Sequence, residues 1–415
     1  MTGNQVTTKP GAGGALAGDE VLVLGAGIGG LAAALALRGA GASVQVLEQA
    51  PALREVGAGL QISPNGVRVL RALGLDPAAL GLRAEAVELH DHKGRLVTRL
   101  ALPESPGSFL CHRADLVAGL AAALGAAGGQ ITLDHRIDRL SLDAGADEGA
   151  GVALRVLSGS GHALRHEAGL VIGADGLHSL ARGALNGAAA PVFTGQVAWR
   201  ALIPGEGAHE RPVVQVFMGP GRHLVSYPLR GGALRNLVAV EERQRWAAEG
   251  WNHHDDPGAL RRAFSGFGGP VPDWLQSVRE VLLWGLFRHP VAARWHDAAG
   301  RVAILGDAAH PTLPFLAQGA NMALEDAAVL AAALSAAGRG GDRVAALARY
   351  QAARATRCAA IVRAADRNAR AWHLRPPLAP LAHAVLALGG RIAPGLALRR
   401  FAWVHDHDAT RAIAG

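Results

Sequence analysis

Cysteine is almost absent from this 415-residue sequence, which holds only Cys111 and Cys358. The two lie far apart and form no CxxC pair, so neither a disulfide-stapled scaffold nor a zinc ribbon is available. A chain of this length also buries enough apolar surface to fold without such cross-links. A reducing, cytoplasmic environment is therefore expected.

Long apolar runs are missing as well. Arg38 ends the run that begins at Val21, and Pro380, His383 and Arg391 interrupt the apolar segment near the C-terminus. Neither reaches the roughly 20 residues that a membrane-spanning helix needs. Residues 1–19 contain no apolar segment of the signal-peptide kind, so we expect a flexible tail there and no membrane span.

Lysine is nearly absent too, and arginine carries most of the positive charge. The 41 basic and 34 acidic side chains leave a net charge of +7, with a surplus of arginine after residue 339. Six of these arginines follow one another at near-helical spacing among alanines: Arg349, Arg354, Arg357, Arg363, Arg367 and Arg370. No aromatic residues interleave with them to stack bases, so the pattern predicts a solvated helix face and no nucleic-acid partner.

The first motif is a glycine-rich turn between a short apolar strand, Val21–Leu24, and a helix over residues 31–38. In this turn Gly25 permits a tight bend, Gly27 lets the backbone approach a pyrophosphate, and Gly30 brings helix and strand together. Glu48 ends the next strand, where its carboxylate can accept hydrogen bonds from a ribose diol. These features predict a dinucleotide site and leave NAD and FAD both open.

Two further apolar strands each end in glycine and aspartate. Residues 170–172 lead into Gly173-Ala174-Asp175-Gly176, and residues 301–305 lead into Gly306-Asp307, a proline-containing loop and a helix from about Gly319 to Leu334. Carboxylates at the carboxyl ends of parallel strands stand where ligands bind in open α/β sheets. Residues 82–110 and 192–290 instead show strand-like segments separated by Gly-Pro and Arg-Gly-Gly turns, which predicts an antiparallel sheet.

Together, these dispersed motifs resemble those of the single-component flavoprotein aromatic hydroxylases built like p-hydroxybenzoate hydroxylase. The resemblance implies an FAD site in which Gly25, Gly27, Gly30 and Glu48 hold the adenosine half. It also implies that Asp175 belongs to a motif serving FAD and the nicotinamide cofactor, and that Asp307, after Gly306, holds the ribityl chain. Arg113, within Cys111-His112-Arg113-Ala114-Asp115-Leu116, is similar to the family's arginine near the FAD pyrophosphate.

Shorter segments resemble the salicylate and 3-hydroxybenzoate hydroxylase branch: residues 53–59, Pro64-Asn65, Thr194-Gly195, Trp199-Arg200, residues 318–321, Glu325-Asp326 and residues 403–406. The activity implied is hydroxylation of a small aromatic acid of the salicylate, 3-hydroxybenzoate or hydroxynicotinate type. NADH or NADPH would reduce FAD, and O₂ would form a flavin C4a-hydroperoxide that delivers one oxygen to the ring.

The expected fold class is α/β, with a Rossmann-type FAD-binding domain, an inserted antiparallel β-sheet substrate domain and C-terminal helices. The FAD-binding domain would comprise residues 20–81, 111–190 and 295–375. The substrate domain would comprise residues 82–110 and 191–294, and residues 376–415 would form the C-terminal helical segment.

Two chemical needs of such a reaction can be assigned to residues. Reduced flavin is best held as an anion, and the helix that opens at Gly319, Ala320 and Asn321 would direct its positive end toward it. The base that ionises a phenol is expected to be His223, whose ordinary pKa of about 6.5 lies well below the value of about 10 for a phenol. Assistance from Tyr227 or from the substrate's surroundings is therefore needed.

His223 and Tyr227 lie four residues apart on a predicted strand, hence on one face with Cα atoms about 13 Å apart. Both can line one ring-sized cavity, but they cannot easily grip one oxygen. The spacing resembles the His and Tyr of the 3-hydroxybenzoate and 6-hydroxynicotinate hydroxylases. The alternative is that His223 merely follows a turn and Tyr227 belongs to the core.

Pro314-Phe315 stands where the 3-hydroxybenzoate enzymes carry a polar Gln-Tyr pair, which favours a more apolar pocket roof. Phe315, Trp199, Phe217 and Trp284 are candidate walls or core residues. Two other functions remain open: an FAD monooxygenase acting on a quinone, polyketide or other ring, and a non-catalytic flavin-binding interaction protein. The sequence leaves monomer and homodimer, and NADH and NADPH, undecided.

Overall fold

A computed structural model describes residues 14–53, 59–142, 152–244, 253–393 and 395–411. At its centre lies a parallel five-stranded sheet built from short apolar strands far apart in the chain. The strand order is β19 (Val302–Ile304), β12 (Leu170–Gly173), β1 (Glu20–Leu24), β2 (Ser43–Leu47) and β8 (Gln130–Thr132). The three predicted motifs therefore follow three adjacent strands, β1, β12 and β19.

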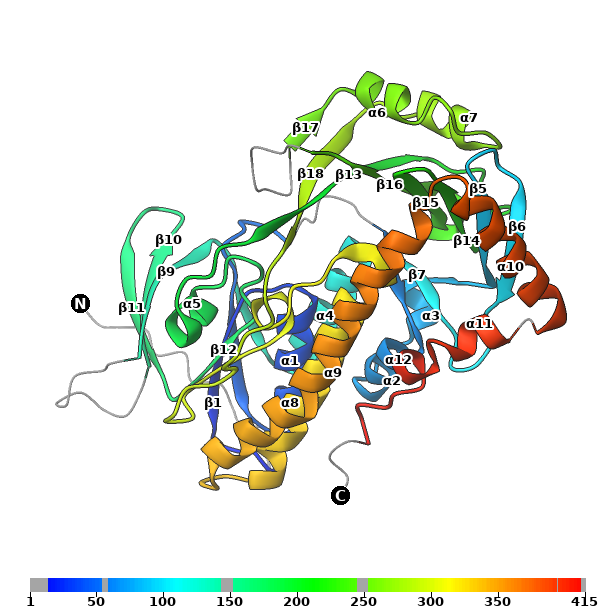
Figure 1. The fold of residues 1–415 in the computed structure, drawn as a ribbon. Helices are drawn as coiled ribbons and strands as arrows, with labels where there is room; N and C mark the ends of the chain where they lie inside the picture. Colours follow the sequence, from blue (N-terminus) through cyan, green and yellow to red (C-terminus); the bar gives the residue numbers. More distant parts are fainter. Residues whose placement is uncertain (1–13, 54–58, 143–151, 245–252, 394, 412–415) are drawn as a thin grey trace.

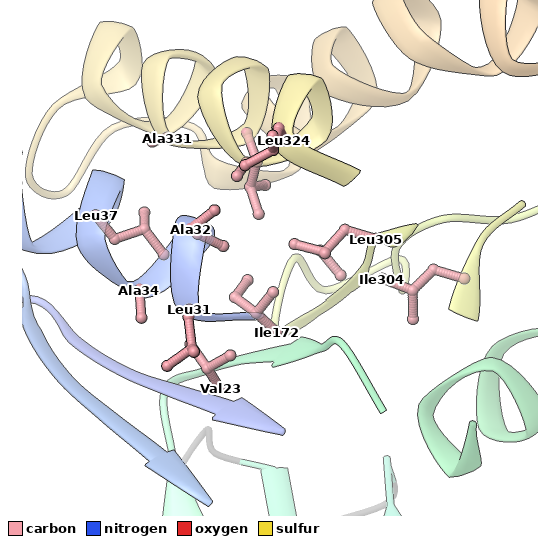
Figure 2. Close-up of a cluster of buried hydrophobic side chains, with 14 of the residues drawn as sticks. Val23, Leu31, Ala32, Ala34, Leu37, Ile172, Ile304, Leu305, Leu324 and Ala331 are labelled. Carbon is pink, nitrogen blue, oxygen red and sulfur yellow. The ribbon is translucent and has the colours of Figure 1, made fainter. Parts of the chain in front are cut away.

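Helices α1 (Ile28–Gly39) and α8 (Gly319–Ala337) pack against each other beside this sheet. Figure 2 shows Leu31 of α1 above Val23 of β1, and Leu324 of α8 on the opposite side of α1. All three side chains are fully buried. α9 (Arg343–Trp372) lies along α8, and α4 (Arg113–Ala126) packs on α1. α8 alone, among the described helices, is long and apolar enough for a membrane span, and 67% of its apolar window is buried inside the protein.

A second, eight-stranded sheet holds the predicted antiparallel region. Its order is β17 (His253–Asp255), β18 (Val281–Arg288), β13 (Val192–Pro204), β16 (Leu234–Glu242), β15 (Arg222–Leu229), β14 (Val213–Gly219), β5 (Ala86–Asp91) and β6 (Leu96–Ala101). Every pair is antiparallel except β14 with β5, which run parallel. α6 (Pro257–Ala263) and α7 (Val271–Gln276) lie over the outer face of this sheet (Figure 1).

The remaining elements complete the layers. One small sheet contains β3 (Gly59–Ile62), β7 (Phe109–His112) and β4 (Gly81–Arg83), and another, which the sequence did not predict, contains β11 (Ala163–Ala168), β10 (Val152–Ser158) and β9 (His135–Ser141). The other helices are α2 (Pro64–Ala72), α3 (Pro77–Leu80), α5 (Leu180–Asn186), α10 (Leu378–Ile392), α11 (Leu396–Arg399) and α12 (Ala402–His405). The α/β fold class with a mainly antiparallel second sheet and C-terminal helices is confirmed.

Two expectations need correction. The tail expected through residue 19 is wrong for residues 14–19, because Leu16 is buried and its backbone N–H donates to the Ala40 carbonyl at 2.9 Å. Residues 1–13, and residues 54–58 of the glycine-containing motif before β3, lie outside the described residues. The solvated arginine face on α9 is also wrong at Arg354, which is fully buried against α8, and at Arg357, whose side chain is 11% exposed and paired with Glu325.

Candidate functional site

A cavity of about 460 Å³ lies where the carboxyl ends of β1, β12 and β19 meet one face of the eight-stranded sheet. Its volume falls in the range usual for ligand sites. The cavity is lined by these predicted site residues: Gly27, Arg113, His223, Tyr227, Gly306, Asp307, Gly319 and Ala320. The other five predicted residues lie outside this lining: Gly25, Gly30, Glu48, Asp175 and Asn321.

The three glycines of the first turn have different surroundings. Gly25 has φ +98°, and a Cβ added there would lie 2.6 Å from the Ala174 carbonyl oxygen. A Cβ on Gly30 would lie 2.0 Å from the Gly25 carbonyl oxygen. At Gly27, by contrast, an added Cβ would meet nothing within 4 Å, and this residue caps α1 at the cavity wall. Gly25 and Gly30 thus secure the packing of the turn, while Gly27 leaves open space at a helix N-terminus suited to a phosphate.

We expect Gly27→Ala to weaken FAD binding at least tenfold while leaving the folded apoprotein nearly as stable as the wild type. The added methyl group meets no protein atom, so its cost falls on a pyrophosphate approaching the helix. Flavin fluorescence titration measures the affinity, and thermal unfolding measures the stability. Gly39→Ala, at the exposed far end of the same helix and with equally open surroundings, is the matched control; it should leave the FAD affinity unchanged and raise the stability by at most about 1 kcal/mol. Equal FAD affinities in both variants would contradict the assignment.

Three of the predicted polar residues bond to the local backbone or to neighbouring side chains. The Glu48 carboxylate accepts hydrogen bonds from the backbone N–H groups of Ala26, at 2.7 Å, and Ala50, at 2.8 Å, so it is held beside the glycine turn. Asp175 accepts from the Ser179 hydroxyl and from the first N–H groups of α5. Asn321 ties the first turn of α8 to β3 and to Ser63. Their places are next to the cavity rather than in its wall.

Asp307 and Arg113 both line the cavity, and they come from two different elements, the end of β19 and the start of α4. Asp307 follows β19 and lines the cavity. It is solvent-accessible even though it is set deep among other parts of the protein. Burial raises the pKa of Asp307, and the positive charges of His310 and Arg113 oppose that rise. Arg113 begins α4, and burial lowers the pKa of its guanidinium while Asp307 counteracts the shift. The pair offers a carboxylate acceptor and a cationic donor at one end of the cavity.

These features fit FAD. The open space at Gly27 suits the pyrophosphate, Glu48 stands beside the turn for a ribose, and Asp307 presents an acceptor to polyol hydroxyls. Gly319 and Ala320 bring the N-terminus of α8 to the cavity wall, with its free N–H groups and positive dipole end. The described residues therefore provide positions for both ends of the dinucleotide.

The eight-stranded sheet forms the other wall, and it carries a cation that the sequence interpretation did not assign to the site. Arg200 on β13 lines the cavity, with its guanidinium carbon 4.5 Å from the centre of the Trp284 ring. Its Nε atom has no hydrogen-bond partner, and no carboxylate of the described residues is among the charges that act on its pKa. Burial and the nearby Arg113 lower the pKa of Arg200 to about 10. Because a charge in such surroundings is usually paired, we expect Arg200 to bind an anionic group of a ligand.

His223 and Tyr227 project from β15 into the same cavity. The His223 ring lies 4.9 Å from the Trp372 ring and 5.7 Å from the Phe315 ring, measured between centroids. Burial lowers the pKa of His223 well below its ordinary value, so the imidazole is neutral at pH 7. Burial raises the pKa of Tyr227, against the opposing charge of Arg200, so its hydroxyl stays protonated. The two side chains line one cavity, as their spacing predicted.

Of the four aromatic side chains expected to line the cavity, two do so and two lie on the other face of the sheet. Phe315 and Trp284 line the cavity. Trp199 and Phe217 do not, because they point to the other face and pack under α6 and α7 in a separate apolar cluster. Strand alternation explains the split, since Trp199 and the neighbouring Arg200 must face opposite sides.

The site is anchored from behind by a buried charge cluster at the start of α8. The Asp326 carboxylate accepts from the Gly306 backbone N–H at 2.9 Å and contacts His310 Nε2 at 2.5 Å. Arg354 of α9 bonds both Asp326, at 2.7 Å, and Glu325, at 2.5 Å. Because Gly306 and Asp307 are adjacent, this cluster fixes the loop that carries the cavity carboxylate.

Comparison with known proteins agrees with this geometry. A family model described as FAD binding domain matches residues 19–365. The chain is 38% identical over 329 residues to a 3-amino-4-hydroxybenzoate 2-monooxygenase of Streptomyces cremeus, covering 75% of this chain and 77% of that protein. It is 36% identical over 337 residues to a 3-hydroxybenzoate 6-hydroxylase of Polaromonas naphthalenivorans, covering 75% and 78%.

A solved structure of Klebsiella pneumoniae HpxO complexed with FAD and uric acid has a similar fold, with a TM-score of 0.76. The two chains are 26% identical, and the superposition covers 91% of this chain and 95% of that one. The fold similarity therefore extends over most of both chains.

Proposed function

This chain belongs to the FAD binding domain family and is a flavoprotein monooxygenase, and from that premise we propose that it hydroxylates a small aromatic acid bearing a ring hydroxyl group. The proposed reaction consumes O₂ and NADH or NADPH. Named monooxygenases among the relatives argue against the alternative of a non-catalytic flavin-binding protein. The substrate class is proposed from the cavity and from these relatives.

Arg200 is the observation that carries the choice of an acid over a neutral ring. The wall around it is apolar, made by Val225, Val238, Trp284 and Phe315 among others. A half-buried guanidinium without an acidic partner among the described residues costs free energy until an anion pairs with it. A carboxylate fits the planar guanidinium in bidentate geometry, and the apolar wall fits an aromatic ring.

The chain's own residues would hold and orient both molecules. Gly27, Glu48, Arg113 and Asp307 would hold FAD, with the N-terminus of α8 directed at the flavin ring. When bound, FAD supplies the redox chemistry that activates O₂ with electrons from NAD(P)H. The apolar wall excludes water from the substrate's reacting edge.

His223 would serve as the base that receives the substrate's hydroxyl proton. It is neutral and therefore able to accept a proton, and it lies at the wall of the cavity. Tyr227, held protonated, would instead donate a hydrogen bond to a substrate oxygen. In this arrangement the two residues act on different oxygens, which agrees with their separation along β15.

The proposal is tested by comparing matched acids and amides. The purified protein is expected to be yellow, and hydroxybenzoates should stimulate its NAD(P)H oxidation much more than the corresponding hydroxybenzamides. Product analysis should show one added oxygen per molecule. A panel of salicylate, 3-hydroxybenzoate, 3-amino-4-hydroxybenzoate and hydroxynicotinate covers the class. Equal stimulation by acid and amide would remove Arg200 from substrate recognition, and stimulation only by neutral quinone-like rings would replace the proposed substrate class.

A further inference from the structure

Three hydrogen-bonded side chains lead from the cavity to the protein surface. His223 Nδ1 lies 2.6 Å from His373 Nε2, and His373 Nδ1 lies 3.0 Å from Glu242 Oε1. The His373 side chain is 2% exposed, whereas that of Glu242 is 39% exposed. The chain of contacts therefore begins at a cavity residue and ends at a carboxylate in contact with water.

The three residues come from separate elements that meet at one corner of the eight-stranded sheet. His223 is near the start of β15, and Glu242 is at the end of the neighbouring strand β16. His373 follows the last turn of α9, whose Trp372 contacts the His223 ring. Backbone bonds fix the corner, since Gly221 donates to the His373 carbonyl at 3.3 Å and Glu242 donates to the Gly221 carbonyl at 2.9 Å.

Hydrogen-bond chemistry sets the direction of the chain. His373 Nδ1 has two contacts, Glu242 Oε1 at 3.0 Å and Gln196 Nε2 at 3.5 Å. A carboxylate can only accept, so in the shorter contact His373 donates through Nδ1–H. His373 is neutral, because burial lowers its pKa despite the opposing effect of Glu242, and its Nε2 must therefore accept the Nδ1–H of His223. His223 Nε2 is then the unprotonated nitrogen that remains for a substrate hydroxyl.

A proton taken up by His223 cannot stay there at low cost. The imidazole is fully enclosed, and the imidazolium form would be a buried cation beside a second imidazole. The 2.6 Å contact with His373 offers a way to pass a proton on without building up that charge. The half-exposed Glu242 offers the final exchange with water, next to Arg375 at 3.1 Å.

We propose that His373 and Glu242 extend His223 into a proton relay that carries the substrate's hydroxyl proton from the closed cavity to solvent. The inference rests on the hydroxylase function proposed above. As the substrate O–H bond breaks, the proton binds His223 Nε2, the Nδ1 proton of His223 moves to His373 Nε2, and the Nδ1 proton of His373 moves to Glu242 and then to water. One proton enters and one leaves, no electrons move along the chain, and the reverse sequence returns the proton to the product. His223 is the catalytic base, while His373 and Glu242 are positioning residues that act through it.

Two substitutions interrupt the relay while preserving acceptors for its hydrogen bonds. His373→Gln retains an oxygen that can accept from His223, and Glu242→Gln retains an oxygen that can accept from His373, but neither amide takes up a proton. Each variant should lower the hydroxylation rate about 100-fold, the lower end of what general bases contribute. The rate of flavin reduction by NAD(P)H, measured without O₂, should stay within about twofold of the wild type, since this step needs no base.

Substrate acidity separates a relay from a structural role. Ring-fluorinated hydroxybenzoates have more acidic hydroxyl groups and need less help from a base. The rate deficit of both variants should therefore shrink as the substrate becomes more acidic. A merely structural defect would slow all substrates equally, and that result would overturn the relay. Unchanged rates in both variants would overturn it as well.

Glu241→Gln is the matched control, because it makes the same change one residue away. Glu241 pairs with Arg222 at 3.2 Å and Arg243 at 3.0 Å, and its carboxylate makes no hydrogen bond or ion pair with His223, His373 or Glu242. Its rate should equal that of the wild type for every substrate. If wild-type enzyme hydroxylates no aromatic acid, the proposed function fails and the relay fails with it. If the wild type hydroxylates but the variants keep its rates, only the relay fails.

Discussion

Arg200→Gln is expected to lower kcat/KM for a hydroxybenzoate by about 10²- to 10³-fold and to abolish the preference for the acid over the amide. Desolvated charge-assisted contacts of this kind are worth about 2–5 kcal/mol, and each 1.4 kcal/mol is a factor of ten. The hydroxybenzamide loses much less, because it brings no negative charge to the guanidinium. The ratio of the two kcat/KM values is therefore the decisive measurement.

Arg200→Lys should fall between the wild type and the glutamine variant. Lysine retains the charge but loses the planar fork that grips two carboxylate oxygens and stacks on Trp284. Steady-state kinetics with the same acid and amide will show whether charge alone supports recognition. A lysine variant as weak as the glutamine variant would assign the effect to geometry.

Arg243→Gln is the control for this series. Arg243 also stacks on a tryptophan, with its guanidinium carbon 4.6 Å from the centre of the Trp199 ring, but it does not line the cavity. The substitution removes the same formal charge and a comparable stacking contact at the residue that follows β16. A loss of acid preference in this variant would show that the effect of Arg200→Gln reflects the net charge of the protein rather than contact with the carboxylate.

The position of Arg200 in the cavity wall could not be predicted from the sequence. Residues 197–203 are apolar at every position except 200. The segment therefore lacks the alternation of polar and apolar residues that would show which side chains face the cavity and which face the opposite side of the sheet. The face is set by pairing, with Arg200 opposite Val238 on β16 and Leu282 on β18. A charged residue inside an apolar strand was the available signal, because such a charge needs a partner or a ligand.

The glycine motif of the first turn, by contrast, could be predicted because all of its parts are close together in the sequence. The turn at residues 25–30 and the strands on either side of it form one contiguous unit, so spacing alone fixes their geometry. The carboxylate after β19 was predictable because adjacent parallel strands end at the same edge. The relay was not, since 150 residues separate His223 from His373 and no local pattern links a strand to the end of a helix.

The arginines of α9 gave a wrong expectation at Arg354. Helical spacing among alanines is compatible with a solvated face, and Arg349, Arg363, Arg367 and Arg370 are indeed exposed. Arg354 turns toward α8, where Glu325 and Asp326 need a counter-charge. The acidic pair was visible in the sequence, but the packing of the two helices that joins it to Arg354 depends on the tertiary fold.

Arg354→Met is expected to destabilise the protein by about 3–5 kcal/mol, which is the usual cost of removing one partner from a buried ion pair. Glu325 and Asp326 are fully buried, and among the described residues the substitution leaves Arg357 and His310 as their ion-pair partners. Because typical stabilities are about 5–15 kcal/mol, a large shift in the urea midpoint should result. FAD binding should weaken too, since Asp326 holds Gly306 in the loop that carries Asp307.

Arg349→Met is the matched control, because Arg349 is exposed on the same helix. It should change the midpoint by no more than about 0.5 kcal/mol. Equal midpoints for the two variants would show that the cluster contributes nothing to stability. Replacing Glu325 with Gln in the Arg354→Met background should recover part of the loss, because one uncompensated charge is removed.

The pH dependence of this loss follows from the carboxylates. Burial would raise the pKa of Asp326, but His310 and Arg354 together lower it to about 2. A depressed carboxylate stabilises the fold fully above its unfolded pKa of about 3.9 and loses that contribution as the pH falls through the folded value. Removing Arg354 raises the folded pKa, so the stability difference between wild type and variant should be largest near neutral pH and shrink steadily below pH 4. Denaturation at a series of pH values measures this directly, and a difference independent of pH would mean that lost packing, rather than lost charge, accounts for the effect.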